Sequence, residues 1–241
     1  FHGIEACYRQ SDKWFGGVTC TNGAGSSRTG LYKDYSDDEM CEVRRREQEQ
    51  AAVVGEYAAM VQLDYPSSSM KDSSNPSPVA DLTAILEATR PDVVYTHNPA
   101  DKHTTHVAVT AAVLKALRTL PPEAQPKQVL GCEVWRGLDW MVDADKSLLD
   151  VSGRPNLSAA IGGIFDSQIA GGKRYDLAVQ GRRLANATFF DSHAVDDVEQ
   201  LWFAMDLTPL VNDPTLDPVE FTAAFIRRFE EDVRSSLGNY F

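Results

Sequence analysis

The sequence predicts an α/β protein with a Rossmann-like, mostly parallel sheet and helices on both faces. Helix-like and strand-like segments alternate over the first two-thirds of the chain, and this alternation is typical of a parallel sheet. The segment "DVVYT" at residues 92–96 has a continuous apolar centre, as strands buried on both faces do. Because no composition break divides the 241 residues, we expect a single domain over 1–241.

The elements of the first half follow in a regular order. Residues 2–10 read as a helix, and 14–21 read as a strand closed by the turn-forming "NGAGS". Ser36 followed by Glu39 forms a capping box that predicts the start of a helix over the next twenty residues. "MVQLDY" at 60–65 is the next expected strand, and the polar Pro/Ser segment 66–78 is an expected loop.

A second run of elements completes the alternation. A helix over 79–90 is stopped by Pro91 and leads into the strand 92–96. An amphipathic helix over 105–120 and a strand over 128–135 follow. The last third predicts a strand at 145–152, helices at 156–170 and 173–189, and a C-terminal helix over 218–238. In that last helix Phe221, Phe225 and Phe229 recur every four residues and form one apolar stripe.

Composition excludes several classes of partner. The net charge of −12 argues against nucleic acid and against an anionic membrane surface, since both attract basic proteins. No apolar run reaches the length of a transmembrane helix. The four cysteines have no C-x-x-C spacing, and we expect them to be buried free thiols. Free thiols suit a reducing compartment, which predicts a cytoplasmic protein. A homo-oligomer is possible on the sequence alone.

A cluster of chemically active side chains follows the expected strand 92–96. Three of the five histidines, His97, His103 and His106, stand with Asp101 within ten residues of "PDVVYTHNPADKHTTHVAV". Ligands of open α/β sheets bind at the carboxyl ends of strands, and this loop lies at such an end. The positive end of the following helix favours the neutral imidazole that a metal needs. The H-x-x-H spacing alone also fits a pair of surface or helix-capping histidines. The prediction of a metal or catalytic site therefore rests on the histidines and Asp101 together.

The same residues resemble the second motif of the PIG-L/LmbE-like family of zinc-dependent N-acetyl-sugar deacetylases. That motif runs roughly H-x-x-x-D-x-H-x-D-H, and Thr105 stands here where the family usually has Asp. "VTCTNGAGS" resembles the loop after the family's second strand, and "VRRREQEQAAVVG" resembles its R-x-x-E helix. "FDSQI" resembles the family's H-x-S-Q segment with Asp166 at the histidine position, and the resemblance spans about residues 1 to 195.

The resemblance implies a role for each matching residue. His106 would be a Zn²⁺ ligand, and His103 would stabilise the oxyanion or protonate the leaving amine. Asp101 would orient His103, while Asn22, Arg44 and His97 would contact a small N-acetyl sugar substrate.

Several of these positions have simpler interpretations. Asn22 fits a plain turn, Asp166 fits an ordinary helix or loop residue, and a surface histidine is the likelier role of His193. Trp135 and Trp140 could stack on a sugar, yet core packing explains them as well.

The family's first motif, A-H-P-D-D-E, is not found in the sequence. It supplies a His and an Asp as zinc ligands and an Asp as general base, whereas His2 and Glu5 lie in what reads as the following helix. We therefore expect the chain to begin just after that motif, to bind zinc weakly or not at all, and to be inactive as it stands. An alternative is a non-catalytic carbohydrate-binding or small-molecule-binding module. A nucleotide-binding fold is disfavoured because "NGAGS" lacks the third glycine of G-x-G-x-x-G.

Overall fold

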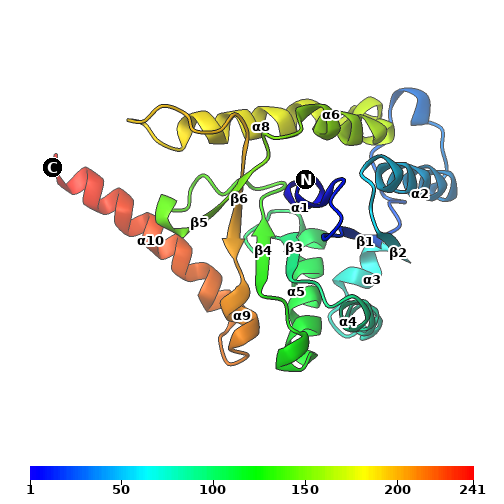
Figure 1. Ribbon diagram of the computed structural model, residues 1–241, viewed down its shortest axis with the longest axis horizontal. Coiled ribbons are helices and arrows are strands. Elements are labelled where there is room, and N and C mark those ends of the chain that lie inside the picture. The colour runs from blue at the N-terminus through cyan, green and yellow to red at the C-terminus, as the bar shows by residue number, and fades with distance from the viewer. The chain divides into compact units, whose positions relative to one another are not determined.

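The computed structural model describes residues 1–241, which form two compact units (Figure 1). Unit 1 comprises Phe1–Asp72 and Asp150–Trp202, and unit 2 comprises Ser73–Leu149 and Phe203–Phe241. Both units combine helices with parallel strands, so the α/β class expected from the sequence is confirmed. The single domain over 1–241 remains a prediction.

Unit 1 is built around two parallel strands and the helix that connects them. Strand β1 pairs in parallel with β2, with an irregularity between Thr19 and Thr21. Helix α2 packs on β2 and on α6, and buries Ala51 against Ile4, Leu157 and Ile161. The elements of unit 1 are α1 (His2–Cys7), β1 (Gly16–Thr21), a 3₁₀ turn (Gly30–Tyr32), α2 (Asp37–Val54), β2 (Ala59–Tyr65), α3 (Ser67–Lys71), α6 (Pro155–Ile164), α7 (Asp166–Gln168), a π turn (Ile169–Lys173) and α8 (Tyr175–Phe189).

Unit 2 contains most of a four-stranded sheet in the order β3-β4-β6-β5. Strand β3 runs parallel to β4, while β6 runs antiparallel to β4. Helix α5 packs against α4 and β3 and buries Leu114, Ala116 and Leu117. The elements are α4 (Ser77–Thr89), β3 (Val93–His97), α5 (Thr104–Thr119), 3₁₀ turns (Pro122–Ala124 and Asp143–Asp145), β4 (Gln128–Cys132), β5 (Lys146–Asp150), β6 (Leu201–Asp206), α9 (Thr208–Asn212) and α10 (Pro218–Gly238).

Strand β6 and the short helices α3 and α9 were not expected from the sequence. Strand β6 carries the apolar run Leu201–Met205, most of it buried, and pairs with β4 some seventy positions earlier in the chain. The short helix α3 lies inside the Pro/Ser segment that reads as a loop, and buries Met70. Strand β6 and helix α3 are held by contacts with distant residues, which a reading of local sequence patterns does not register.

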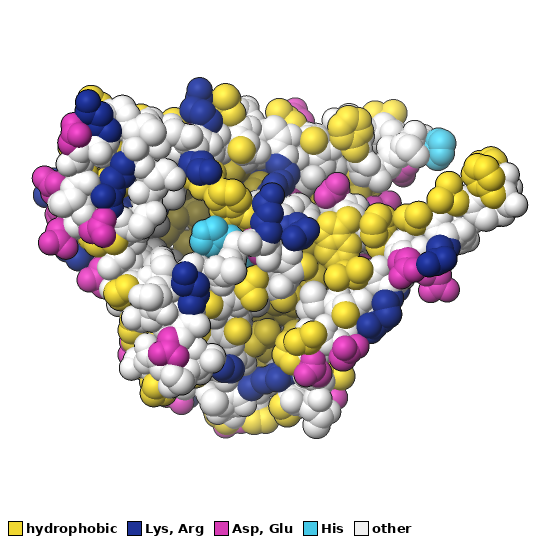
Figure 2. Space-filling model, turned by 180° about the vertical axis from the view of Figure 1, so that it is seen from behind, with side chains coloured by type: hydrophobic (Ala, Val, Ile, Leu, Met, Phe, Trp, Pro, Cys, Tyr) yellow, Lys and Arg dark blue, Asp and Glu magenta, His cyan; other side chains and the backbone are white.

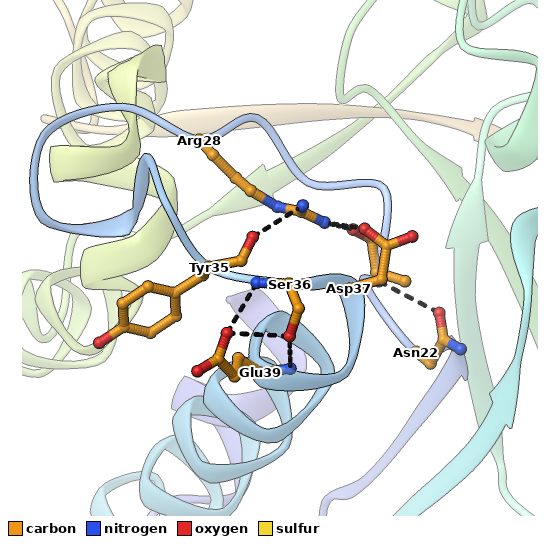
Figure 3. Close-up of polar contacts among 7 residues, drawn as sticks. Asn22, Arg28, Tyr35, Ser36, Asp37 and Glu39 are labelled. Atoms are coloured by element: carbon orange, nitrogen blue, oxygen red, sulfur yellow. Dashed lines mark hydrogen bonds and ion pairs between the residues drawn. The ribbon is translucent and has the colours of Figure 1, made fainter.

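The start of α2 follows the capping box read from the sequence. The Ser36 hydroxyl accepts a hydrogen bond from the Glu39 N–H at 3.2 Å, and the Glu39 carboxylate accepts one from the Ser36 N–H at 2.7 Å. Arg28 reaches across the preceding loop and contacts the Tyr35 carbonyl and the Asp37 carboxylate (Figure 3). The capping box pairs two backbone N–H groups at the start of the helix, and Arg28 ties the loop before the helix to its first residue.

We expect Ser36→Ala to lower the free energy of unfolding by about 0.5–2 kcal/mol, because a free N–H at the start of α2 loses its acceptor. Urea titration followed by far-ultraviolet circular dichroism measures the change. Ser235→Ala is the matched control, since Ser235 is exposed within α10 and away from its first turn. A Ser36 variant as stable as this control would show that the capping box contributes nothing to the fold.

Candidate active site

The histidine loop begins where β3 ends. His97 is the last residue of β3 and lies opposite Cys132 in the parallel register with β4. Asn98 is fully buried, and both its backbone N–H and its side-chain amide donate to the Cys132 carbonyl, at 2.9 and 3.1 Å. This double hydrogen bond fixes the point at which the chain leaves the sheet. The loop therefore lies at the carboxyl end of a parallel strand, as expected for an open α/β sheet.

Asp101 is the buried centre of this loop. One carboxylate oxygen accepts the His103 N–H at 2.9 Å, and the other accepts the Trp135 N–H at 3.1 Å. The second oxygen also lies 3.4 Å from His106 Nδ1. A carboxylate can only accept, so the His106 ring carries its proton on Nδ1 and leaves Nε2 with a free lone pair. Asp101 thus orients the His106 ring, whereas it holds His103 through the backbone, and the sequence-based assignment of Asp101 to the His103 ring does not match this contact.

The three imidazoles are stacked against one another. The His97 and His106 rings are nearly parallel, with centroids 3.9 Å apart and planes at 6°. The His103 ring lies 4.5 Å from His106 and 5.7 Å from the Trp135 ring. His103 caps α5 at its N-terminus, and its Nδ1 is buried without a hydrogen-bond partner. His103 is thus the member of the stack with a buried ring nitrogen that has no partner, and the Trp135 ring lies beside it.

Burial keeps the His97 and His106 imidazoles neutral. It lowers the pKa of His97 to about 3, helped by the neighbouring His106, although Asp101 acts in the opposite direction. The pKa of His106 is also lowered by burial, against the opposing hydrogen bond with Asp101. Burial alone would raise the pKa of Asp101, but hydrogen bonds from His103, His106 and Trp135 hold it below its ordinary value. The group at neutral pH is therefore a carboxylate beside uncharged His97 and His106 rings.

A second polar group lies in unit 1, around the turn after β1. Asn22 accepts the Ala24 N–H at 3.2 Å, which makes it the start of an Asx turn (Figure 3). Gly23 has φ +78°, and a Cβ there would lie 2.6 Å from Cγ of Arg44. Only glycine fits both that backbone conformation and that close approach. The turn and the Arg44 side chain therefore pack directly on each other.

Arg44 is fixed by residues that the sequence analysis did not single out. Its Nη1 donates to the Glu47 carboxylate at 2.5 Å, and its guanidinium lies over the Phe165 ring at 5.4 Å. Glu47 is 5% exposed and accepts both the N–H and the hydroxyl of Ser167, at 2.7 and 2.8 Å. The signal was present in the sequence, since Glu47 follows Arg44 at a spacing of three on one helix. Of the three arginines Arg44–Arg46, Arg44 is partly buried, whereas Arg45 and Arg46 are exposed.

The remaining candidate residues are scattered. Asp166 is exposed, and one of its carboxylate oxygens accepts a hydrogen bond from the Tyr32 hydroxyl at 2.6 Å. His193 is exposed in unit 1, as expected for a surface histidine. Trp140 packs against Phe229 with ring centroids 6.4 Å apart, which favours core packing over sugar stacking. The sequence predicts that the histidine loop, Asn22 and Arg44 line one pocket. These residues belong to two different units, so this stays a prediction.

Comparison with protein families identifies this arrangement of motifs. Residues 2–117, which include the β1–α2 turn and the histidine loop, match the model of the PIG-L family, described as GlcNAc-PI de-N-acetylase. This part of the chain is similar to a PIG-L domain. The resemblance read from the residues is thereby confirmed. Among curated proteins, none matches the chain.

Solved structures are similar to this chain in fold over most of its length. The N,N'-diacetylchitobiose deacetylase of Pyrococcus horikoshii is similar with a TM-score of 0.66 and 15% identity, over 88% of this chain and 80% of that one. A conserved protein of Thermus thermophilus gives 0.62 and 18%, over 90% and 91%. GalB, the 4-carboxy-2-hydroxymuconate hydratase of Pseudomonas putida, gives 0.62 and 13%, over 86% and 88%. Because the fold serves both a deacetylase and a hydratase, it does not by itself select the reaction.

The side chains of this chain do not make up a complete zinc site. A zinc ion needs about three protein ligands that converge on one point. Within residues 1–241, no group of three or more His, Cys, Asp or Glu side chains is placed to hold a metal ion. The near-parallel stack of His97 and His106 puts their ring nitrogens in separate planes, and Asp101 already engages Nδ1 of His106. His106 Nε2 is the donor best suited to a metal, and it is a single donor.

Membrane attachment through a spanning helix finds no support in the fold. Even the longest helix, α10, is not apolar enough to cross a bilayer, and the same holds for the other helices.

We expect the stability of the protein to fall as the pH drops below about 6.5, the ordinary pKa of histidine. Below this pH, His97 becomes protonated in the unfolded chain. In the folded protein, where its pKa is about 3, it stays neutral. His97 alone then contributes a slope of up to about 1.4 kcal/mol per pH unit. Urea titrations between pH 7.5 and 4.5 measure it, and His97→Gln should show a shallower slope. Equal slopes in both proteins would contradict the buried, neutral state of His97.

Proposed function

We propose that this chain is the body of an N-deacetylase of the LmbE type, a hydrolase that acts on a small N-acetylated sugar or glycoside. The observation that carries the proposal is the coincidence of two independent findings. The PIG-L match covers residues 2–117, and within it the buried Asp101–His106 pair lies at the carboxyl end of β3. The deacetylase among the similar solved structures supports the reaction class.

The reaction defines what the site must do. Water adds to the acetamide carbonyl, the C–N bond breaks, and acetate and a free amine leave, so a proton must reach the departing nitrogen. A positioned histidine is a suitable carrier because its proton exchange is easy near neutral pH. His103 fits this role in the present chain, since its ring lies beside His106 with a buried Nδ1 that has no other partner.

Asp101 and His106 have a supporting role in this scheme. A histidine that donates one ring N–H to a carboxylate presents the other nitrogen as a fixed, more basic acceptor, which is the usual arrangement around metal-binding histidines. His106 would hold the zinc that the family uses, and a bound zinc would polarise the carbonyl and activate water. Since the side chains of this chain do not complete a zinc site, we propose that it binds zinc weakly or not at all without further ligands.

Arg44 and Asn22, in unit 1, are further residues proposed to contact the substrate. Arg44 uses one nitrogen for Glu47 and Ser167, which leaves other donors of its guanidinium for a substrate oxygen. The Phe165 ring and the Gly23 turn hold the side chain in one place. We propose that Arg44, Asn22 and His97 contact the N-acetyl sugar. N-acetylglucosamine derivatives are the first substrates to test.

A binding module without catalysis is the competing function. The single suitable zinc donor favours it, because a pocket that lacks metal and general base can still bind a sugar. The two proposals differ in the effect of an added strand and H-x-D-D motif. A deacetylase should gain zinc and turnover, whereas a binding module should gain no turnover.

We expect His106→Ala and His103→Ala to have different effects in a version of the chain that carries a strand and an H-x-D-D motif before Phe1. His106→Ala should lose metal and activity together. His103→Ala should keep the metal and lose roughly 10²–10⁴-fold in kcat, as general acid–base groups do. His193→Ala is the matched control, because His193 is exposed. Unchanged turnover of the His103 variant at saturating substrate would refute its role in proton transfer.

We expect the 241-residue chain by itself to hold substoichiometric zinc and to show no deacetylation, and the extended version to gain both. Elemental analysis after dialysis gives the metal content, and release of acetate from N-acetylglucosamine derivatives gives the activity. Tight stoichiometric zinc with turnover in the short chain would show that the metal site is misplaced. An extended chain with full zinc and no turnover would support the binding module instead.

A further inference from the structure

Trp135 follows strand β4 in the same way as the histidine loop follows β3. Strand β4 ends at Cys132, which lies opposite His97 in the parallel register. Because the two strands are parallel, the segments that follow them leave the sheet at the same edge. The centroid of the Trp135 ring lies 5.7 Å from that of the His103 ring, with the planes at 34°. The sheet therefore brings an indole and an imidazole together from two separate loops.

Two buried carboxylates fix the position of Trp135. The Trp135 backbone N–H donates to Asp101 at 3.1 Å. Glu133, two residues earlier, is fully buried, and its carboxylate accepts the Leu138 N–H at 2.9 Å and the Phe203 N–H at 3.1 Å. The first of these two bonds closes the turn that contains Trp135, and the second ties that turn to β6. The indole is therefore carried by a segment that is held at both ends.

The surroundings of Trp135 differ from those of Trp140. Trp140 packs edge-on against Phe229 of α10, and Figure 2 shows hydrophobic side chains along one edge of that helix. The Trp135 ring lies instead beside the imidazole of His103, whose Nδ1 is buried without a hydrogen-bond partner. Trp135 is also only partly buried. Apolar packing accounts for Trp140, whereas Trp135 belongs to a polar group of side chains.

We propose that the pyranose ring of the substrate stacks on the Trp135 indole, which Glu133 positions, and that the site thereby selects cyclic amino sugars over acyclic N-acetyl amines. The choice of ligand rests on the proposed function. An N-acetylated amino sugar carries its nitrogen directly on the ring. The surface that holds the ring must therefore lie beside the group that protonates the nitrogen. His103 has that role in the proposed reaction, and Trp135 lies next to it.

An indole suits this ligand because of the way a pyranose distributes its polar groups. The C–H groups of a glucose-type ring point to its two faces, while the hydroxyls lie around the rim. An aromatic face can cover the C–H groups and leave the hydroxyls in water, so no polar group is buried without a partner. An acyclic N-acetyl amine has no such face, and its binding should not depend on Trp135.

Indole N–H signals in a heteronuclear NMR spectrum report separately on the four tryptophans of the isotope-labelled 241-residue chain. Methyl N-acetyl-β-glucosaminide should shift the Trp135 signal in a saturable way, with a dissociation constant on the order of one millimolar. Trp14 is 73% exposed in unit 1, and its signal should not move. N-acetylethanolamine at the same concentrations should leave both signals unchanged. A Trp135 signal that ignores the glycoside, or responds equally to both compounds, would overturn the proposal.

Substitution of the ring measures its contribution. Trp135→Ala should weaken binding of the glycoside at least about threefold, while Trp135→Phe should keep most of the affinity because an aromatic face remains. Both variants retain the backbone N–H that donates to Asp101, and an unchanged Trp140 indole signal checks that the loop is intact. Trp14→Ala is the matched control and should bind like the parent chain. Equal affinity of Trp135→Ala and the parent would contradict the stacking.

Glu133→Gln tests how the indole is positioned. The amide nitrogen of glutamine cannot accept a hydrogen bond, so either the Leu138 or the Phe203 N–H loses its acceptor. The affinity for the glycoside should fall, but in the Trp135→Ala background the same substitution should cause no further loss, because effects exerted through one group are not additive. Glu231→Gln is the control, since Glu231 is exposed on α10. Additive losses would show that Glu133 does not act through Trp135.

Binding and turnover separate this proposal from the deacetylase itself. In the version extended by a strand and an H-x-D-D motif, Trp135→Ala should raise KM for the glycoside and leave kcat/KM for N-acetylethanolamine unchanged. Deacetylation of both compounds with equal kcat/KM would overturn the selection of cyclic substrates and leave the deacetylase standing. A glycoside that shifts the Trp135 signal of a chain that never deacetylates would support the stacking and refute the deacetylase.

Discussion

The candidate active site depends on one buried carboxylate. Asp101 is a charged group out of water, and it is stabilised by two backbone N–H groups and the Nδ1–H of His106. One of those backbone donors starts α5, and the other follows β4, so the carboxylate ties the histidine loop to its two flanking elements. A buried charge without partners is very costly, and hence these elements must keep their positions for the charge to persist.

The same carboxylate decides which chemistry the histidines can perform. It sets the tautomer of His106 and leaves Nε2 free, while burial keeps His97 and His106 neutral. Neutral imidazoles can bind metals and accept protons, and imidazolium ions cannot do either. The stacking of the rings restricts their movement as well. The geometry therefore favours a preformed polar site, although its one suitable zinc donor needs further ligands.

Glu47 has a comparable position in unit 1. Its carboxylate joins Arg44 on α2 to Ser167 on α7, and so it connects helices that lie about 120 residues apart in the sequence. The carboxylates of Asp101 and Glu47 both lie within residues 2–117, which match the PIG-L model. Asp101 is part of the histidine motif, and Glu47 is the acidic member of the R-x-x-E helix. The fold alone would be less informative, because a hydratase and a deacetylase share it.

The sequence by itself determined the α/β class, the capping box of α2, the strand before the histidine loop and the resemblance to the PIG-L family, because each of these features follows from a local sequence pattern. The position of His103 at the start of α5 follows from the same local rules. Tertiary structure alone decided that Asp101 contacts the His106 ring, that Ser167 joins the Arg44–Glu47 pair, and that β6 joins the sheet. The sequence spacing of these residues does not distinguish the actual partners from other candidates. Only the folded structure shows which of them are in contact.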